Sequence, residues 1–288
     1  MDSLDKLMGE SISRKVELIR TKIGNFLINI QDVIGTSLKI TGVWESWLIV
    51  VYGKVIQKEW TVIDAGANIG CHTIPFARLC KKVYAFEPQR EVYNNLCSNI
   101  FLNGLDNIII PIRKGLGDKV EKKQLWSIHH EDFNNGTWNW GGRGIEQENC
   151  SHDFNPDEYR EHDQIDVVPL DSYNFDRCDL IKMDIQGYEL FALKGAKNTI
   201  EKFKPIILLE NGIHDNSELE QNIEVKKYLI SLGYEFYRMN FDTKLIPSMK
   251  QYNNDDCFVL HPESEFYSFT KLAMEQCPDG YNFKKETE

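Results

Sequence analysis

The segment TVIDAGANIG, residues 61–70, constrains the fold of this 288-residue chain more than any other. Apolar residues suited to a strand open it, a glycine turn ends the run, and CHTIPFARLC, residues 71–80, has the length and apolar content of a helix. A strand, a tight turn and a helix in this order are typical of an open α/β sheet, in which ligands bind at the carboxyl ends of the strands. Because Gly66 and Gly70 lack a Cβ, a ligand could approach the backbone of this turn closely.

The spacing within the turn favours a small charged ligand over a dinucleotide. Dinucleotide-binding turns read G-x-G-x-x-G, whereas here Asn68 stands in the position of the second glycine and the last glycine comes one residue early. Asp64 would repel a phosphate but could bind an ammonium group, and the N–H groups at the start of the following helix favour a carboxylate. S-adenosylmethionine (SAM) carries both groups on its methionine end. A glycine turn without a ligand is the alternative.

Composition restricts the class of protein further. The length is compatible with one large domain or two small ones, and no apolar run approaches the roughly 20 residues that span a membrane. The net charge of −11 argues against a nucleic acid as partner, since such proteins need a basic face. Seven cysteines without a C-x-x-C pair predict reduced thiols, and the acidic N-terminus lacks the apolar core of a secretory signal. We therefore expect a cytoplasmic protein without a membrane span.

The first 58 residues lack the strand–turn–helix rhythm of the rest of the chain. In residues 11–34 the apolar side chains recur at near-helical spacing, which predicts one or two amphipathic helices. We interpret residues 1–58 as an N-terminal helical cap or lid, and residues 59–288 as the main α/β domain.

From residue 60 onward, short apolar runs alternate with helical stretches. Parallel strands are predicted at residues 81–88, 107–113, 178–184 and 204–210, and a final antiparallel pair at 234–239 and 257–261. Four strand ends carry an acid: Asp64, Glu87, Asp184 and Glu210. Because the carboxyl ends of parallel strands meet at one edge of a sheet, these carboxylates could converge on one crevice. Glu87 follows the glycine turn at about the 20-residue distance at which an acid accepts hydrogen bonds from ribose hydroxyls.

Residues 119–166 form a long segment without clear periodicity, of the kind that usually carries a function. Its turn-rich centre, NNGTWNWGGRG at residues 134–144, combines aromatic and amide side chains that suit a sugar ring. We predict that this turn lines an acceptor pocket through Trp138, Asn139, Trp140 and Gly141. The acidic run that follows it is expected to be a solvated face.

Five segments together resemble the FkbM-type SAM-dependent methyltransferases. In chain order they are VIDAGANIGCHT (62–73), YAFEPQREVYNNLCSN (84–99), GLGDK (115–119), LIKMDIQGYELFALKGA (180–196) and KPIILLEN (204–211). The resemblance implies a Rossmann-like class I methyltransferase fold, with a seven-stranded, mostly parallel sheet and an antiparallel last strand. It also implies methyl transfer from SAM to an oxygen, often a hydroxyl of a sugar, a lipid-linked glycan or a secondary metabolite.

The resemblance further implies which residues contact the cofactor. Glu87 would bind the ribose, and Leu116, Gly117 and Asp118 would lie near the adenine. The methionine part would be bordered by the residues of the glycine turn and the start of the next helix, namely Asp64, Gly66, Ala67, Asn68, Gly70 and Thr73.

Methyl transfer to a hydroxyl needs a group that removes the proton, or a metal ion that acidifies the hydroxyl. Asp184, at the end of a buried strand, is our first candidate for the base. Glu210, at the neighbouring strand end, could share a Mg²⁺ or Mn²⁺ ion with Asp184 or bind a sugar. Histidine is the commonest base in enzymes, so His214 and His72 are alternatives.

One position departs from the family pattern. The family commonly reads K-x-D-x-E-G at the fourth strand end, and here Gln186 stands in place of the glutamate. The acceptor is expected to be a small molecule or a glycan, and no oligomeric state is predicted. Two other classes stay open: a SAM- or nucleotide-binding protein without catalysis, which Gln186 would fit, and a nicotinamide-dependent oxidoreductase, which Asn68 disfavours.

Overall fold

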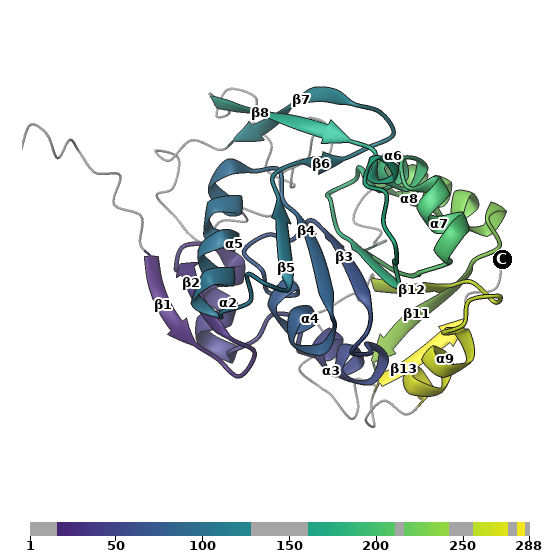
Figure 1. Ribbon diagram of the computed structural model, residues 1–288, viewed down its shortest axis with the longest axis horizontal. Helices are drawn as coiled ribbons and strands as arrows, with labels where there is room; N and C mark the ends of the chain where they lie inside the picture. The colour runs from purple at the N-terminus through teal and green to yellow at the C-terminus, as the bar shows by residue number, and fades with distance from the viewer. Residues whose placement is uncertain (1–15, 128–160, 211–215, 242–255, 276–280, 286–288) are drawn as a thin grey trace, which may run out of the picture.

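A computed structural model describes residues 16–127, 161–210, 216–241, 256–275 and 281–285 (Figure 1). Its centre is an eight-stranded sheet with the order β13-β11-β12-β10-β9-β3-β4-β5. In chain order these strands are β3 Thr61–Ala65, β4 Lys82–Phe86, β5 Ile109–Ile112, β9 Leu180–Met183, β10 Ile206–Glu210, β11 Glu235–Phe241, β12 Asp256–Leu260 and β13 Tyr281–Lys285.

The strand directions confirm the predicted sheet. Strands β5, β4, β3, β9 and β10 are parallel neighbours. Strand β12 lies antiparallel between β10 and β11, which confirms the antiparallel final pair. These seven strands form the mostly parallel sheet with an antiparallel last strand that the resemblance implied. Strand β13, which the sequence did not predict, pairs antiparallel with β11 and adds an eighth.

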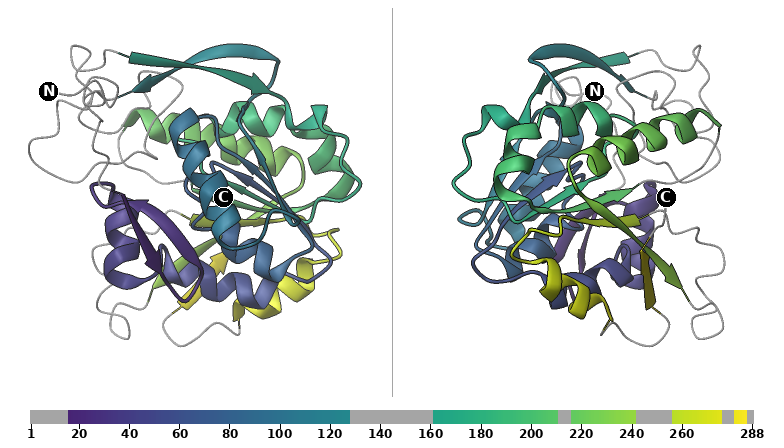
Figure 2. Two further views of the ribbon diagram at one scale, coloured as in Figure 1. Left: turned by 60° about the vertical axis from the view of Figure 1, so that its left-hand side comes forward. Right: turned by 90° about the vertical axis from the view of Figure 1, so that its right-hand side faces the viewer.

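Helices cover both faces of the sheet (Figure 2). Successive strand residues point to opposite faces: Val62 packs into one buried cluster together with residues of α3, α4, α5 and α9, and Ile63 into another with residues of α6, α7 and α8. The helices of the two faces are α3 Ser46–Val55, α4 Thr73–Leu79, α5 Arg90–Leu102, α9 Tyr267–Glu275, and α6 Glu189–Lys194, α7 Lys197–Phe203, α8 Asn216–Ser231. Along the described parts of the chain, no helix has both the length and the apolar character needed to cross a membrane.

The helix prediction for residues 11–34 is wrong between residues 16 and 29. Strands β1 Val16–Arg20 and β2 Asn25–Asn29 form an antiparallel hairpin, and helices α2 Val33–Thr41 and α3 follow it. In β2 the side chains of Phe26 and Ile28 are buried and their neighbours are half-buried, which is the two-residue period of a strand packed on one face. The same apolar residues also fit a helical spacing over this short stretch, so the pattern alone was ambiguous.

The description of residues 119–166 as irregular is also wrong at both ends. Strands β7 Glu121–Ser127 and β8 Glu161–Val168 form with β6 Gly115–Leu116 a separate three-stranded sheet. Within it Leu125, Ile165 and Val167 are buried, but charged and amide residues occupy the positions between them and conceal the alternation in the sequence. The predicted acceptor residues Trp138, Asn139, Trp140 and Gly141 lie outside the described residues.

A buried asparagine connects the N-terminal hairpin to the main domain. Asn99, on α5, is fully buried and accepts a hydrogen bond from the Leu27 backbone N–H at 2.6 Å. Its amide nitrogen donates to the backbone oxygens of Ile69, at 2.8 Å, and of Leu27, at 3.3 Å. One side chain therefore holds strand β2 against the glycine turn after β3. The division at residue 58 into a cap and a main domain stays a prediction.

Replacing Asn99 should destabilise the protein. Asn99→Ala would leave the half-buried N–H of Leu27 and the buried carbonyl of Ile69 without this partner, at a cost of about 1–3 kcal/mol. Denaturant unfolding followed by circular dichroism would measure the loss. Ser98→Ala, at an exposed neighbouring position of α5, is the control and should change the free energy of unfolding by less than about 0.5 kcal/mol. Equal effects of the two substitutions would contradict this role of Asn99.

Candidate functional site

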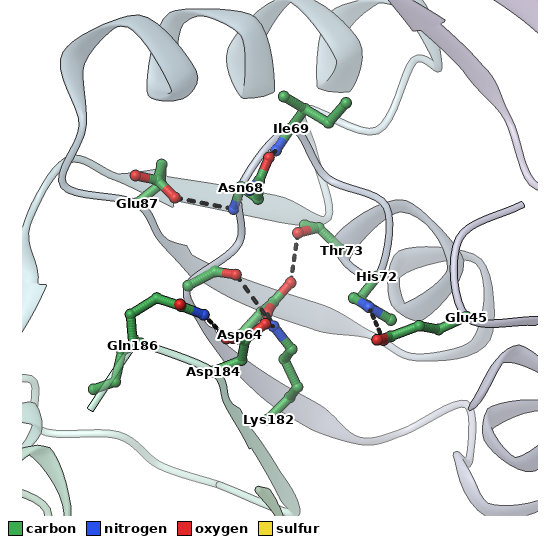
Figure 3. Close-up of polar contacts among 12 residues, drawn as sticks. Glu45, Asp64, Asn68, Ile69, His72, Thr73, Glu87, Lys182, Asp184 and Gln186 are labelled. Carbon is green, nitrogen blue, oxygen red and sulfur yellow. Dashed lines mark hydrogen bonds and ion pairs between the residues drawn. The ribbon is translucent and has the colours of Figure 1, made fainter. Parts of the chain in front are cut away.

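The predicted acids lie at one edge of the central sheet, and Figure 3 shows three of them, Asp64, Glu87 and Asp184. Asp64 belongs to β3, Glu87 directly follows β4, Asp184 directly follows β9, and Glu210 ends β10. These strands are parallel neighbours, so their carboxyl ends share the edge at which ligands bind in such sheets.

Asp64 is fully buried beneath the glycine turn. Its Oδ2 accepts a hydrogen bond from the Thr73 hydroxyl at 2.6 Å. Its Oδ1 has no hydrogen-bond partner, and the ammonium of Lys182 lies 3.8 Å from it. A buried carboxylate oxygen in this state is able to accept a hydrogen bond from a cationic ligand.

Lys182, on β9, occupies the centre of the site with only 6% of its side chain exposed. Its ammonium donates to the carbonyl of Gly66 at 3.2 Å and to Oδ2 of Asp184 at 3.3 Å. Burial by itself would lower the pKa of Lys182, but the carboxylates of Asp184, Asp64 and Glu45 together raise it above its usual range. Lys182 therefore stays charged and binds the ends of β3 and β9 to each other.

Asp184 is held from two sides and remains partly exposed. The Gln186 side-chain amide donates to its Oδ1 at 2.8 Å, and 36% of the Asp184 side chain is accessible. Burial would raise the pKa of Asp184, but Lys182 and hydrogen bonds with Glu210 and Gln186 lower it below its usual value. Gln186 thus provides a donor that an ionised glutamate would lack. A lowered pKa keeps Asp184 ionised and makes it a weak proton acceptor.

Glu87 closes the other end of the glycine turn. Its Oε2 accepts from the Asn68 N–H at 3.0 Å and its Oε1 from the Gln89 N–H at 2.9 Å. Asn68 has a φ of 50°, in the left-handed region that asparagine tolerates better than most residues. This conformation directs the turn's N–H toward Glu87.

A pocket opens between the ends of β3, β4 and β9. Its walls are Ala65, Gly66, Phe86, Glu87, Pro88, Gln89, Lys114, Gly115, Leu116, Leu125, Asp184, Ile185 and Gln186. Of the three residues predicted near the adenine, Leu116 lines this pocket. Gly117 and Asp118 are not among the lining residues. Gly117 is buried and so tightly packed that a Cβ there would lie 2.6 Å from the Val167 side chain, whereas Asp118 is exposed.

Gly66 is required for a further reason that the sequence did not predict. It has a φ of +79°, and a Cβ at this position would lie 1.8 Å from the backbone oxygen of Asp184. The absent side chain therefore makes room for the neighbouring strand end, while the Gly66 backbone still lines the pocket. Gly70, with a φ of +97°, would bring a Cβ within 3.0 Å of Leu96.

A second polar cluster reaches the site from the N-terminal segment, and the sequence did not predict it. Glu45 immediately precedes α3, and its Oε2 lies 3.0 Å from Nε2 of His72. Nδ1 of the same histidine lies 3.1 Å from the Tyr52 hydroxyl. His72 is thus buried between two polar partners.

The sequence analysis also missed Lys182, although the sequence contains a sign of its role. Lys182 is the only charged residue within the buried strand LIKM.

The predicted catalytic and metal residues are only partly brought together. Asp184 and Glu210 are neighbours, whereas His214 lies outside the described residues. No group of three or more metal-binding side chains occurs among the residues that the structure describes. A shared Mg²⁺ or Mn²⁺ ion at Asp184 and Glu210 therefore stays a prediction without structural support.

The residues present fit SAM by three separate observations. The Asp64 oxygen without a hydrogen-bond partner suits the ammonium, the Glu87 carboxylate beside the pocket suits ribose hydroxyls, and Leu116 adds an apolar wall for the base.

A family model described as the methyltransferase FkbM domain matches residues 64–236, which is more than half of the chain. The chain belongs to the FkbM methyltransferase domain family. The sheet and its helices are the class I methyltransferase fold that this family membership implies.

Individual proteins resemble the chain over different lengths. An aminocarboxypropyltransferase for 4-demethylwyosine of tRNA(Phe), from Methanocaldococcus jannaschii, is 42% identical over 57 residues, which are 19% of this chain and 23% of that protein. A solved FkbM methyltransferase from Methylobacillus flagellatus is 21% identical with a TM-score of 0.45, covering 70% of this chain and 44% of that one. The solved M. jannaschii TYW2 in complex with AdoMet is 18% identical with a TM-score of 0.40, covering 86% and 84%. The chain thus spans less than half of the first two proteins.

The role of Gly66 can be separated from ordinary backbone strain by comparing two glycines. Gly66→Ala should lower the free energy of unfolding through its positive φ, about 1–2 kcal/mol, and by a further 1–3 kcal/mol or so from overlap with Asp184. Gly104→Ala, at a φ of +63° with no atom within 4 Å of the added Cβ, should show the first effect alone. Denaturant unfolding measures both, and equal losses would contradict the overlap.

Proposed function

We propose that this protein is a SAM-dependent O-methyltransferase that acts on a hydroxyl group, of a sugar, a glycan or a secondary metabolite. The observation that carries the proposal is the pocket at the ends of β3, β4 and β9 in an FkbM domain, with Glu87 on one side of the glycine turn and the buried Asp64 beneath it. A dinucleotide is disfavoured because Asn68 occupies the place where a second glycine would let a pyrophosphate approach.

Each end of the cofactor has a counterpart among the chain's own residues. Glu87 would accept hydrogen bonds from the ribose, Leu116 would contact the adenine, and Asp64 would compensate the ammonium of the methionine part. The backbone of the turn, Gly66, Ala67, Asn68 and Gly70, would border that part. When bound, SAM supplies an activated methyl group for transfer to a nucleophile.

The protein's remaining task is to hold the acceptor oxygen in line with the methyl group and to remove its proton. Asp184 remains our candidate for contact with the acceptor, since it is partly exposed at the edge of the pocket. Its lowered pKa keeps it ionised at neutral pH, although it also makes the carboxylate a weak base. Glu210, His214 or a metal ion held by Asp184 and Glu210 would be needed if Asp184 only positions the hydroxyl.

A screen with methyl-labelled SAM tests the proposal against its alternatives. Sugars, glycans and small hydroxylated metabolites are the acceptors we expect to be labelled. Total tRNA should be included, because the curated relative acts on tRNA(Phe), although the net charge of −11 argues against an RNA partner. Calorimetry should show SAM binding and no NADH binding. SAM binding without labelling of any acceptor would favour a binding protein without catalysis.

Glu87 should contribute to the affinity for every ligand that contains the ribose. Loss of its charge in Glu87→Gln should weaken SAM and S-adenosylhomocysteine alike by roughly ten- to a hundredfold, as expected for hydrogen bonds to a charged group. Isothermal calorimetry measures both affinities. Glu201→Gln, at a half-exposed glutamate of α7, is the matched control. Unchanged affinities in a folded Glu87→Gln protein would exclude Glu87 from the ribose site.

Asp184 can be tested once an acceptor is in hand. If Asp184 receives the hydroxyl proton, Asp184→Asn should lower kcat at least a hundredfold, within the range of general base catalysis, while SAM still binds. Asparagine keeps the size of the side chain and its hydrogen-bonding oxygen. A variant with more than a tenth of the wild-type kcat would exclude the role, and loss of wild-type activity with EDTA, restored by magnesium or manganese, would favour the metal.

A further inference from the structure

Glu45 has an unusual backbone for its residue type. It precedes α3 with φ 48° and ψ 59°, in the left-handed region, although it is not a glycine. Such conformations cost on the order of 1–3 kcal/mol and persist where the surroundings hold them, commonly at ligand sites. Glu45 also lies outside residues 64–236, so family membership assigns it no role. Its conformation therefore needs a local explanation.

The contacts of Glu45 give it a fixed direction. Its carboxylate lies 3.0 Å from Nε2 of His72, whose other nitrogen lies 3.1 Å from the Tyr52 hydroxyl. The Tyr52 ring in turn packs against Phe76 of α4, with 4.6 Å between the ring centroids. His72 is 8% exposed and Glu45 is 25% exposed. The buried histidine thus orients a carboxylate that a ligand can still reach.

This carboxylate faces the charged centre of the site (Figure 3). Lys182 and Asp184 on β9 interact electrostatically with it, and Asp64 on β3 shares the same lysine. The Lys182 ammonium thus lies within ion-pair distance of two carboxylates, those of Asp64 and Asp184, and interacts electrostatically with a third, that of Glu45. Although the Lys182 ammonium lies 3.8 Å away, Oδ1 of Asp64 accepts no hydrogen bond, so it is able to accept one from a second cationic group.

We propose that the Glu45 carboxylate closes the methionine end of the cofactor site and pairs there with the ammonium group of SAM. The inference rests on SAM being the cofactor, as proposed above. It gives the N-terminal segment a direct part in binding and makes cofactor affinity depend on pH.

The sign of this dependence follows from the groups around Glu45. Burial, and then the negative charge of Asp184, raise its pKa from 4.5 to about 7, while Lys182 opposes them. His72 and Tyr52 face it from the other side. A nearby ammonium favours the carboxylate form, so binding releases the proton to the buffer. SAM should therefore bind more tightly as the pH rises through about 7.

Calorimetry in buffers of different ionisation enthalpy measures the released protons directly. At pH 7 the wild-type protein should release roughly half a proton on binding SAM, because Glu45 is then about half protonated. 5′-Methylthioadenosine, which has the adenosine and a thioether but no ammonium, should release none. Protons taken up by the amino group of SAM itself have the opposite sign, so a net release identifies a group on the protein.

The variant Glu45→Gln assigns the released proton. It should abolish the release and weaken SAM at least tenfold, while the affinity for 5′-methylthioadenosine stays within about twofold. Glu17→Gln, at an exposed glutamate of the same N-terminal segment paired with Lys39, should change neither ligand. Glu87→Gln provides the opposite pattern, since it should weaken both ligands.

The outcomes separate this inference from the proposed function. SAM binding without proton release, or an unchanged release in Glu45→Gln, overturns the role of Glu45 and leaves the function intact. Equal weakening of both ligands in Glu45→Gln also overturns it, because that would indicate a general structural defect. Failure of wild-type protein to bind SAM overturns the proposed function itself. If Glu45→Gln does not fold, Glu45→Asp takes its place as the variant, and a wild-type protein that releases no proton with SAM still overturns the inference.

Discussion

The site depends on one buried ammonium group. Lys182 contacts the carbonyl of Gly66, the carboxylate of Asp184 and, at longer range, that of Asp64. A buried lysine is costly unless it is paired, and a buried pair becomes costly when one partner is removed. The lysine and the acids at the neighbouring strand ends therefore require each other. Without the lysine, the carboxylates of β3 and β9 would repel each other at the edge where the pocket opens.

The same strand ends also approach through their backbones. The turn after β3 donates two hydrogen bonds to the Phe86 carbonyl of β4, and Asp184 donates its N–H to the carbonyl of Ala65. Gly66 permits the close approach that these bonds require. The pocket is thus formed by hydrogen-bonded strand ends, and the sheet fixes the positions of the two side chains that face it, Glu87 and Asp184. Preorganisation of this kind is what positioning a ligand needs.

The sequence predicted the parts of this architecture that local patterns determine. Apolar runs ending in acids, such as CDLIKMD, gave both the strands and the convergence of their carboxylates, because parallel strands leave few alternatives. The N-terminal hairpin was missed since Phe26 and Ile28 satisfy two periodicities at once over a short stretch. The Glu45–His72 contact was missed for a different reason: it joins residues whose proximity follows from how α3 packs on α4, and no local pattern encodes that packing. Lys182 was overlooked although a lysine within a buried strand implies a buried partner.

The position of Asn99 has a consequence for the order in which parts of the molecule open. Its side chain holds both strand β2 and the carbonyl of Ile69, so separation of the hairpin from α5 exposes to water the same amide that holds the turn bordering the pocket. The two regions, 42 residues apart in sequence between Leu27 and Ile69, should therefore open and close as one cooperative unit in hydrogen exchange. A ligand seated at the glycine turn would then protect amides of the hairpin that it never touches.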